Sequence, residues 1–538
     1  MSTALPFPLA ARTARIEPFH VMELVKRAAA LQASGRPVIH MSIGEPDFTA
    51  APLVAEAAQR CIRDGQTQYT AANGLPALRE RISQWYADRF GLQIDPDRIV
   101  VTAGASAALQ LVCLALIQSG DEILMPDPSY PCNRHFVSVA GGTPRMIPAT
   151  AEQRFQLSAQ QVLQHWTDAT RGVMLASPSN PTGTSIAPQE LRAIHEVVKA
   201  RGGVTIVDEI YLGLSYDDAY SHSALAIDDH IISINSFSKY FCMTGWRLGW
   251  LVLPPALARQ VELLAQHLFI CASTVSQHAA LACFEPESLA LYEQRRAEFR
   301  TRRDWFVPQL QALGLDVPVM PDGAFYAWAD CSPWFERLGV DNSWDATFAL
   351  MQRAHIVATP GRDFGTADTS RFLRFSTASA LPLLQQAITP CSSCNRLLHR
   401  NIMFHFAIRV YWEDTDAGGI VFYANYLKFF ERARTEWLRA KGIEQQALRE
   451  QTGGMFVVTG TEMKYHRPAR LDDVLCVSAT PLQLGRASVV IGQSARLGAP
   501  DGPLLCEGTI RIGWVNAERM QSARMPVDLL QALEDGAA

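Results

Sequence analysis

A single lysine near the middle of the chain is preceded by two serines and followed by a glycine and an arginine. The run reads Ser236-Phe-Ser-Lys239-Tyr-Phe-Cys-Met-Thr-Gly-Trp-Arg247. A lysine amine forms Schiff bases with carbonyl groups, while hydroxyls and a guanidinium are suitable ligands for a dianionic phosphate. The run therefore predicts a site for an aldehyde that carries a phosphate.

A second reactive pattern lies closer to the C-terminus. It reads Glu413-Asp-Thr-Asp416-Ala-Gly-Gly-Ile-Val-Phe-Tyr423-Ala-Asn-Tyr426 and stands between an expected strand and a long amphipathic helix. A helix N-terminus can polarise a carbonyl group, and a nearby carboxylate can attack that carbonyl or activate water. This pattern indicates acyl-transfer chemistry.

The elements that must position the lysine alternate between apolar strands and helical segments. Such alternation predicts an α/β domain with a mostly parallel sheet, whose ligands bind beyond the carboxyl ends of the strands. Gly104, Asp208 and Lys239 each follow an expected strand, so we expect them to converge. The expected strands are 98–102, 122–125, 172–176, 204–208 and 231–234.

The chain is long enough for more than one domain, at 538 residues. We expect a large domain at about 46–285, and a small α+β domain made of the N-terminal segment and about 286–388. A linker at 389–402 would lead to a second domain at 403–538. In that domain one helix at 426–441 precedes a run of strands, which predicts a sheet wrapped around the helix.

Composition narrows the function classes. Hydrophobic residues make up 48% of the chain and the net charge is -5, which is typical of a globular protein and argues against a general nucleic-acid binder. No apolar run is long enough to span a membrane and no export signal is seen, so we expect a cytoplasmic protein with reduced cysteines. The Cys391 and Cys394 pair lacks the further ligands of a zinc site, and we expect no metal.

The first part of the chain, about residues 10 to 388, resembles the class I/II aminotransferases of fold type I, which use pyridoxal 5′-phosphate. Several separate motifs occur in the family's order. They are 44–47, 69–74, 104–106, 177–183, 208–211, 236–247, 360–361, 364–365 and 374–376.

The resemblance implies a role for each residue around the cofactor ring. Lys239 would hold the cofactor as a Schiff base and later shuttle a proton. Asp208 would pair with the pyridine nitrogen and keep it protonated. Tyr211 and Asn180 would bind the phenolic oxygen of the ring, and Tyr130 would stack on its face.

The resemblance also implies a phosphate site and a carboxylate site. The backbone of Gly104, Ala105 and Ser106 would cradle the phosphate at a helix N-terminus, assisted by Ser236, Arg247 and, from a second subunit, Tyr69. Arg374 would bind the substrate α-carboxylate, with Gly44 and Asn180 beside it. The role of Tyr69 predicts a homodimer or a higher homo-oligomer.

The substrate is less well specified. In an aspartate-preferring branch of the family a lysine stands where this chain has Ser106, which weakens an aspartate-specific interpretation. Neutral or aromatic amino acids would suit the apolar residues near the site. The same lysine and aspartate would also serve a C–S lyase, which would release ammonia from a sulfur amino acid instead of transferring the amino group to a 2-oxo acid.

The second part, about 403 to 535, resembles the 4-hydroxybenzoyl-CoA thioesterase family, which has the hotdog fold, and in particular its Tol–Pal-associated branch. The segment 465–473 also matches. Asp416 aligns with the family's catalytic carboxylate, and the Tyr423 N–H would face the thioester oxygen. That branch often has histidine at this position, so the tyrosine leaves the acyl preference open. A non-catalytic acyl-binding or oligomerisation module is the alternative.

Together the two resemblances predict a bifunctional enzyme. The N-terminal part would transfer an amino group from an L-amino acid to a 2-oxo acid, and the C-terminal part would hydrolyse acyl-CoA thioesters. Met403 looks like a natural start of translation, so the two activities need not be consecutive steps. A transcription factor with an aminotransferase-like sensor domain is disfavoured, because we expect no helix-turn-helix region ahead of the match.

Overall fold

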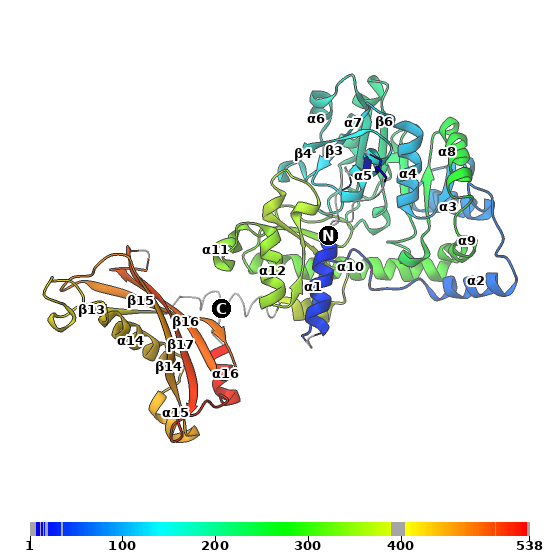
Figure 1. The fold of residues 1–538 in the computed structure, drawn as a ribbon. Helices are drawn as coiled ribbons and strands as arrows, with labels where there is room; N and C mark the ends of the chain where they lie inside the picture. Colours follow the sequence, from blue (N-terminus) through cyan, green and yellow to red (C-terminus); the bar gives the residue numbers. More distant parts are fainter. Residues whose placement is uncertain are drawn as a thin grey trace. The chain divides into compact units, whose positions relative to one another are not determined.

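The computed structural model describes residues 7–10, 12–13, 16, 20–33, 36–388, 404–500 and 502–534. The chain forms two compact units, residues 1–391 and 392–538 (Figure 1). The predicted linker at 389–402, with Cys391 and Cys394, lies outside the described residues. The domain boundaries expected at 46, 286 and 403 stay predictions.

A seven-stranded sheet forms the centre of the first unit, in the order β2-β8-β7-β6-β5-β3-β4. Five neighbouring strands, β7, β6, β5, β3 and β4, are parallel to one another, whereas β8 runs antiparallel to both β7 and β2. This confirms the predicted α/β fold with a mostly parallel sheet. The strands are β2 Ile99–Thr102, β3 Glu122–Asp127, β4 Thr143–Pro148, β5 Thr170–Ala176, β6 Val204–Asp208, β7 Ile232–Ser236 and β8 Gly249–Val252.

Helices cover both faces of this sheet, because alternate strand residues point to opposite sides. Met174 and Ile206 belong to one apolar core, with residues of α4 and α8. Their chain neighbours Val173 and Val207 belong to another, with residues of α6 and α7. The four helices are α4 Ala105–Leu116, α6 Ala159–His165, α7 Pro188–Ala200 and α8 Pro255–Leu268.

Two small sheets complete the first unit. One pairs β1 Ile39–His40 in parallel with β10 Ile356–Val357, so the segment before Gly44 joins the C-terminal part of the unit. The other has the order β11-β12-β9, formed by Thr359–Pro360, Phe372–Ser376 and Tyr326–Asp330. The remaining helices are α1 Val21–Ala33, α2 Pro52–Arg63, α3 Pro76–Phe90, α5 Pro131–Val139, α9 Thr274–Leu281, α10 Pro286–Ala312, α11 Phe335–Leu338 and α12 Ser343–Arg353.

The second unit is an antiparallel five-stranded sheet packed on one helix, α14 Asn425–Ala440, as the sequence predicts. Residues 426, 429, 430, 433 and 437 of α14 share one face and enter the core. The buried Gln493 also binds the helix to the sheet, because it accepts a hydrogen bond from Arg434 Nη1 at 2.7 Å and donates one to the Phe430 carbonyl at 2.9 Å.

The strand order in this sheet is β13-β15-β16-β17-β14. The expected strands at 455–459 and 461–466 are one continuous strand here, with a bulge between Val458 and Gly460. A bulge inserts an extra residue and breaks the alternation along the strand, which explains why the sequence pattern suggests two strands. The strands are β13 Phe404–Arg409, β14 Gly454–Tyr465, β15 Val474–Leu484, β16 Ser488–Leu497 and β17 Leu504–Asn516, and two short helices, α15 Gln445–Thr452 and α16 Val527–Glu534, accompany them.

None of the described helices has the length and apolar character needed to cross a membrane. Within the described residues, no three histidine, cysteine or acidic side chains come together as a group that could hold a metal ion.

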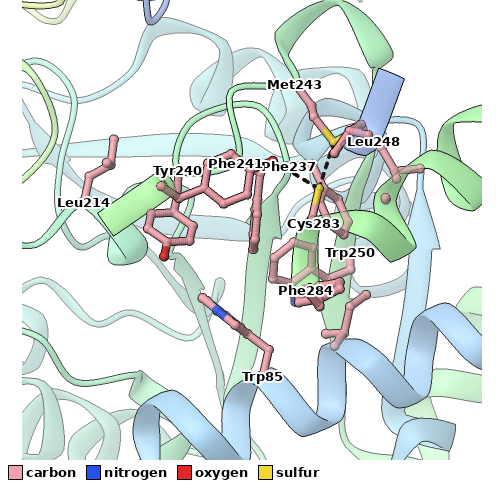
Figure 2. Close-up of a cluster of buried hydrophobic side chains, with 14 of the residues drawn as sticks. Trp85, Leu214, Phe237, Tyr240, Phe241, Met243, Leu248, Trp250, Cys283 and Phe284 are labelled. Carbon is pink, nitrogen blue, oxygen red and sulfur yellow. Dashed lines mark hydrogen bonds between the residues drawn. The ribbon is translucent and has the colours of Figure 1, made fainter. Parts of the chain in front are cut away.

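Aromatic side chains that stand just before and just after Lys239 in the sequence pack together in one buried cluster (Figure 2). Phe237 is fully buried, and its ring lies 4.9 Å from that of Trp250 and 5.0 Å from that of Phe241, centroid to centroid. Trp85 of α3 contacts Phe241 and Trp250 as well. The backbone that carries the lysine is therefore fixed by buried rings before and after it.

Replacing Phe237 with alanine should lower the free energy of unfolding by about 3–5 kcal/mol, because a large buried ring leaves a cavity. Urea denaturation of the full chain, followed by circular dichroism, would measure the loss. Leu263→Ala on α8 is the matched control, since Leu263 is 45% exposed, and it should change the free energy by less than about 0.5 kcal/mol. Equal losses in the two variants would contradict the structural role given to the cluster.

Candidate active sites

A cavity of about 560 Å³ opens where strands β5, β6 and β7 end. This is the edge of the sheet at which parallel α/β folds bind ligands. The small sheets contribute Tyr326 of β9 and Arg374 of β12 to its wall. Of the residues singled out in the first unit, all but Tyr69 and Gly104 line this cavity: Gly44, Ala105, Ser106, Tyr130, Asn180, Asp208, Tyr211, Ser236, Lys239, Arg247 and Arg374.

Lys239 follows β7 and points its amine into the cavity wall, where Nζ donates a hydrogen bond to the Gly44 carbonyl at 2.5 Å. Burial lowers the pKa of this amine to about 8, with Arg374 and Arg247 adding to the effect and Glu45 opposing it. A lysine whose pKa is lowered in this way is a nucleophile and a proton acceptor near neutral pH.

Asp208 is the last residue of β6 and lies on the cavity floor. Burial raises the pKa of its carboxyl to about 6, although the Ile210 N–H donates to Oδ1 at 3.1 Å and the Lys239 charge favours the ionised form. The ionised carboxylate at this position would be further stabilised by a cationic group in the cavity.

Tyrosine hydroxyls form the next part of the wall. The Tyr211 and Tyr326 hydroxyls are hydrogen-bonded at 2.7 Å, and burial raises the pKa of both phenols. Burial also raises the pKa of Tyr130, so all three are neutral hydrogen-bonding groups. Sequence reasoning missed Tyr326, which the run Gly323-Ala-Phe-Tyr326 marks only as the start of an aromatic strand.

The end of the cavity beside α4 has the features of an anion site. Gly104 is the N-cap of α4 and has a φ of +83°, and a Cβ there would lie 2.6 Å from Arg247 Nη2. Glycine is therefore required both for its backbone conformation and for the close approach of the guanidinium. The Ser236 hydroxyl donates to Ser238 Oγ at 3.0 Å. Ser238 also lines the cavity. The sequence predicts a place for Ser236 in the phosphate site but does not single out Ser238.

Arg374 of β12 is a buried residue of the cavity wall. Its Nη1 donates to Asn180 Oδ1 at 2.8 Å and its Nη2 to the Ser42 carbonyl at 2.6 Å, while Nε is buried without a hydrogen-bond partner. A buried guanidinium with an unused donor is suited to bind a carboxylate. The structure thus brings Arg374, Asn180 and Gly44 together at one wall.

Tyr69 lies apart from these residues. Its side chain is 78% exposed and does not line the cavity. Its predicted role, a contact with the phosphate of a second copy, stays a prediction.

In the second unit, the loop before α14 places Asp416 at the surface. Its Oδ1 accepts a hydrogen bond from the Gly418 N–H at 2.8 Å, and its backbone N–H donates to the Ile420 carbonyl. The neighbouring Asp414 is 2% exposed and accepts from the Tyr411 N–H at 3.0 Å. Asp414 therefore stabilises the loop, whereas Asp416 leaves an oxygen available to solvent or substrate.

Tyr423 stands two residues before the first residue of α14, near the positive end of the helix dipole. Its ring is 63% exposed and lies 4.6 Å from the Phe422 ring and 6.4 Å from the Tyr465 ring. The Tyr465 hydroxyl donates to the Tyr423 carbonyl at 3.2 Å. The exposed rings of Phe422, Tyr423 and Tyr465 thus lie together just before the N-terminus of α14, and the catalytic role of Asp416 stays a prediction.

Comparison with known protein families finds a match in each unit. Residues 36–386 match the model of the aminotransferase class I and II family. The chain belongs to this family. Residues 418–501 match the model of the thioesterase superfamily, so the second unit is a thioesterase-superfamily domain; that match begins two residues after Asp416.

Individual relatives cover the first unit almost completely. The valine–pyruvate aminotransferase of Mycobacterium tuberculosis is 36% identical over 70% of this chain and 95% of its own length. A probable aspartate/prephenate aminotransferase of Aquifex aeolicus is 34% identical over 71% of this chain and 96% of its own length. The crystal structure of an aminotransferase from Mycobacterium tuberculosis has a TM-score of 0.69 and 35% identity, and it matches over 73% of this chain and all of that chain.

The cofactor of this aminotransferase family is pyridoxal 5′-phosphate, and the cavity fits it. The lysine with a lowered pKa suits the aldehyde, and the anion site beside Gly104 suits the phosphate. Asp208, buried with a single backbone donor, suits a protonated ring nitrogen. These residues therefore match the aldehyde, the phosphate and the ring nitrogen of the cofactor.

Lys239 should react faster with amine-directed reagents at moderate pH than surface lysines do. In protein prepared without cofactor, its reductive methylation by formaldehyde should rise with pH and reach half its maximum near pH 8, because only the neutral amine is nucleophilic and its pKa is about 8. Mass spectrometry of the Lys239 peptide would measure the profile. Lys464, whose side chain is 73% exposed, is the internal comparison, and identical profiles for both would contradict the effect of burial.

Proposed function

We propose that the first unit transfers the amino group of an L-amino acid to a 2-oxo acid. The observation that carries the proposal is the placement of Lys239, Asp208 and Arg374 around one cavity. Arg374 holds the substrate α-carboxylate, and Lys239 accepts and returns the proton of the α-carbon. Pyridoxal phosphate, when bound, supplies the electron sink and carries the amino group between the two substrates.

The other residues of the cavity position these groups. Asp208 holds the ring nitrogen in its protonated form, Tyr211 and Asn180 contact the phenolic oxygen, and Tyr130 lies against the ring. The N-terminus of α4 binds the phosphate with Ser236 and Arg247. We further propose that Tyr69 reaches the phosphate of a second copy, which makes the enzyme a homodimer or a higher homo-oligomer. Its 78% exposure supports this proposal.

Arg374→Lys should lower kcat/KM for every amino donor by roughly 10–1000-fold, because a single ammonium cannot replace the paired donors of a guanidinium. The loss should fall mainly on KM. Turnover of a panel of L-amino acids with pyruvate or 2-oxoglutarate, scored as amino acid formed from the acceptor, would measure it. Arg371→Lys, on the same segment but outside the cavity, should retain activity. Ammonia release without any acceptor would instead support the C–S lyase alternative.

We propose that the second unit hydrolyses acyl-CoA thioesters. Asp416 would attack the thioester carbonyl or activate water, and the Tyr423 N–H at the start of α14 would stabilise the developing oxyanion. The exposed rings of Phe422, Tyr423 and Tyr465 offer an apolar surface for an acyl group just before α14. The proposal rests on the available oxygen of the exposed Asp416 in the loop that leads to this helix.

Asp416→Asn should lower kcat for acyl-CoA hydrolysis by about 10²–10⁴-fold, because the amide is neither nucleophile nor base. The release of free CoA from a panel of aromatic and aliphatic acyl-CoA esters would measure it. Glu413→Gln is the matched control, since Glu413 lies on the same loop and is exposed, and it should keep activity within a few fold. If Asp416→Asn retained full activity, or if no ester were hydrolysed by the unmodified protein, the second unit would serve as a binding or oligomerisation module.

A further inference from the structure

The positive charges around the cavity are already engaged. Among the described residues that line it, the lysines and arginines are Lys239, Arg247 and Arg374. Lys239 meets the Gly44 carbonyl, Arg247 approaches Gly104 at the anion site, and Arg374 faces the carboxylate position. The described residues that line the cavity include no further lysine or arginine that could bind a second carboxylate of the substrate.

The only acidic residues among the described lining residues are Asp208 and Glu45. Asp208 lies on the floor, whereas Glu45 is exposed and accepts a hydrogen bond from the Thr244 hydroxyl. Glu45 thus places a negative charge at the accessible side of the cavity. Such a charge repels an acidic substrate side chain.

The remaining wall next to the carboxylate site is apolar. Ile43 is 46% exposed and Val25 of α1 is 37% exposed, and both line the cavity with Val21. Val21 and Val25 are four residues apart and therefore share one face of α1. Leu24 and Ala28 on the same side of α1 are fully buried in a core with Met351 and Val357, and this packing holds Val21 and Val25 in the cavity wall.

The position of segment 42–44 determines which part of a substrate meets this wall. The Ser42 carbonyl accepts from Arg374, and the Gly44 carbonyl accepts from Lys239. A substrate with its carboxylate at Arg374 and its α-carbon at Lys239 therefore spans this segment. Ile43, between the two carbonyls, lines the cavity next to these two positions.

We propose that the amino donor carries an uncharged, apolar side chain that packs against Val21, Val25 and Ile43, and that Glu45 disfavours acidic donors. This inference rests on the proposed transamination and adds its substrate class. Burial of a branched aliphatic side chain against such a wall should favour it over a charged side chain by roughly ten- to a hundredfold in kcat/KM.

The first experiment compares donors on the full chain loaded with pyridoxal phosphate. Conversion of the bound cofactor to its amine form would be followed by absorbance with L-leucine, L-valine, L-phenylalanine, L-aspartate and L-glutamate. The neutral donors should exceed the acidic ones by at least roughly tenfold in kcat/KM. Faster conversion by aspartate or glutamate would overturn the proposed side-chain class but leave transamination intact, whereas no conversion by any donor would overturn both.

A variant tests whether this wall is the cause. Val25→Arg adds a cation to the exposed face of α1 and should lower conversion by leucine at least roughly tenfold while raising conversion by aspartate. Ile62→Arg is the matched control, since Ile62 of α2 is 59% exposed and lies outside the cavity, and both activities should be unchanged. If Val25→Arg left the ratio of leucine to aspartate unchanged, the assignment of the wall would be wrong.

Binding of unreactive carboxylates gives a readout independent of turnover. In calorimetric titrations of the same loaded protein, 4-methylpentanoate should bind roughly ten- to a hundredfold more tightly than succinate. Val25→Arg should reduce or reverse this preference, and Ile62→Arg should preserve it. Equal or tighter binding of succinate by the unmodified protein would contradict the proposal. A cation supplied to the cavity by a second copy of the chain would produce this result.

Discussion

Two ionisable groups of opposite sign, Lys239 and Asp208, line one cavity and are both partly removed from water by burial. Burial disfavours both charges, and it brings both pKa values to within about one unit of neutrality, about 8 for the lysine and about 6 for the aspartate. Lys239 can then exchange a proton near neutral pH, whereas a cationic group in the cavity would keep Asp208 ionised. The central sheet makes this possible, because adjacent parallel strands β6 and β7 end at the same edge and deliver the two residues there.

Much of the scaffold follows from local sequence. The apolar strands, the glycine turn before α4 and the amphipathic pattern of α14 are each determined by short-range rules, and the structure agrees with them. The residues around Lys239 could be anticipated because each follows a strand end or a recognisable motif. Their convergence in one cavity is then a consequence of parallel topology.

Other features depend on contacts between distant segments. Tyr326 is hydrogen-bonded to Tyr211, which is 115 residues away in the sequence. The sequence around Tyr326 contains no pattern that predicts this hydrogen bond. The bulge in β14 is seen in its pairing with β17, where the register shifts between Val458 and Gly460. The exposed face of α1 at Val25 becomes part of a cavity wall only through its placement beside segment 42–44, and a helical pattern alone would describe it as solvent-facing surface.

The anchoring of α1 has a consequence for the order of events during synthesis. The Val21 N–H donates to the Asp363 carboxylate across 342 residues, and β1 pairs with β10 over a similar span. The parallel sheet that carries Asp208 and Lys239 is complete in sequence once residue 252 has emerged, and domains fold progressively from the N-terminus during translation. A nascent chain can therefore form the sheet that carries Asp208 and Lys239 before the C-terminal part of the unit has left the ribosome. During that time, α1 and β1 lack their partners Asp363 and β10.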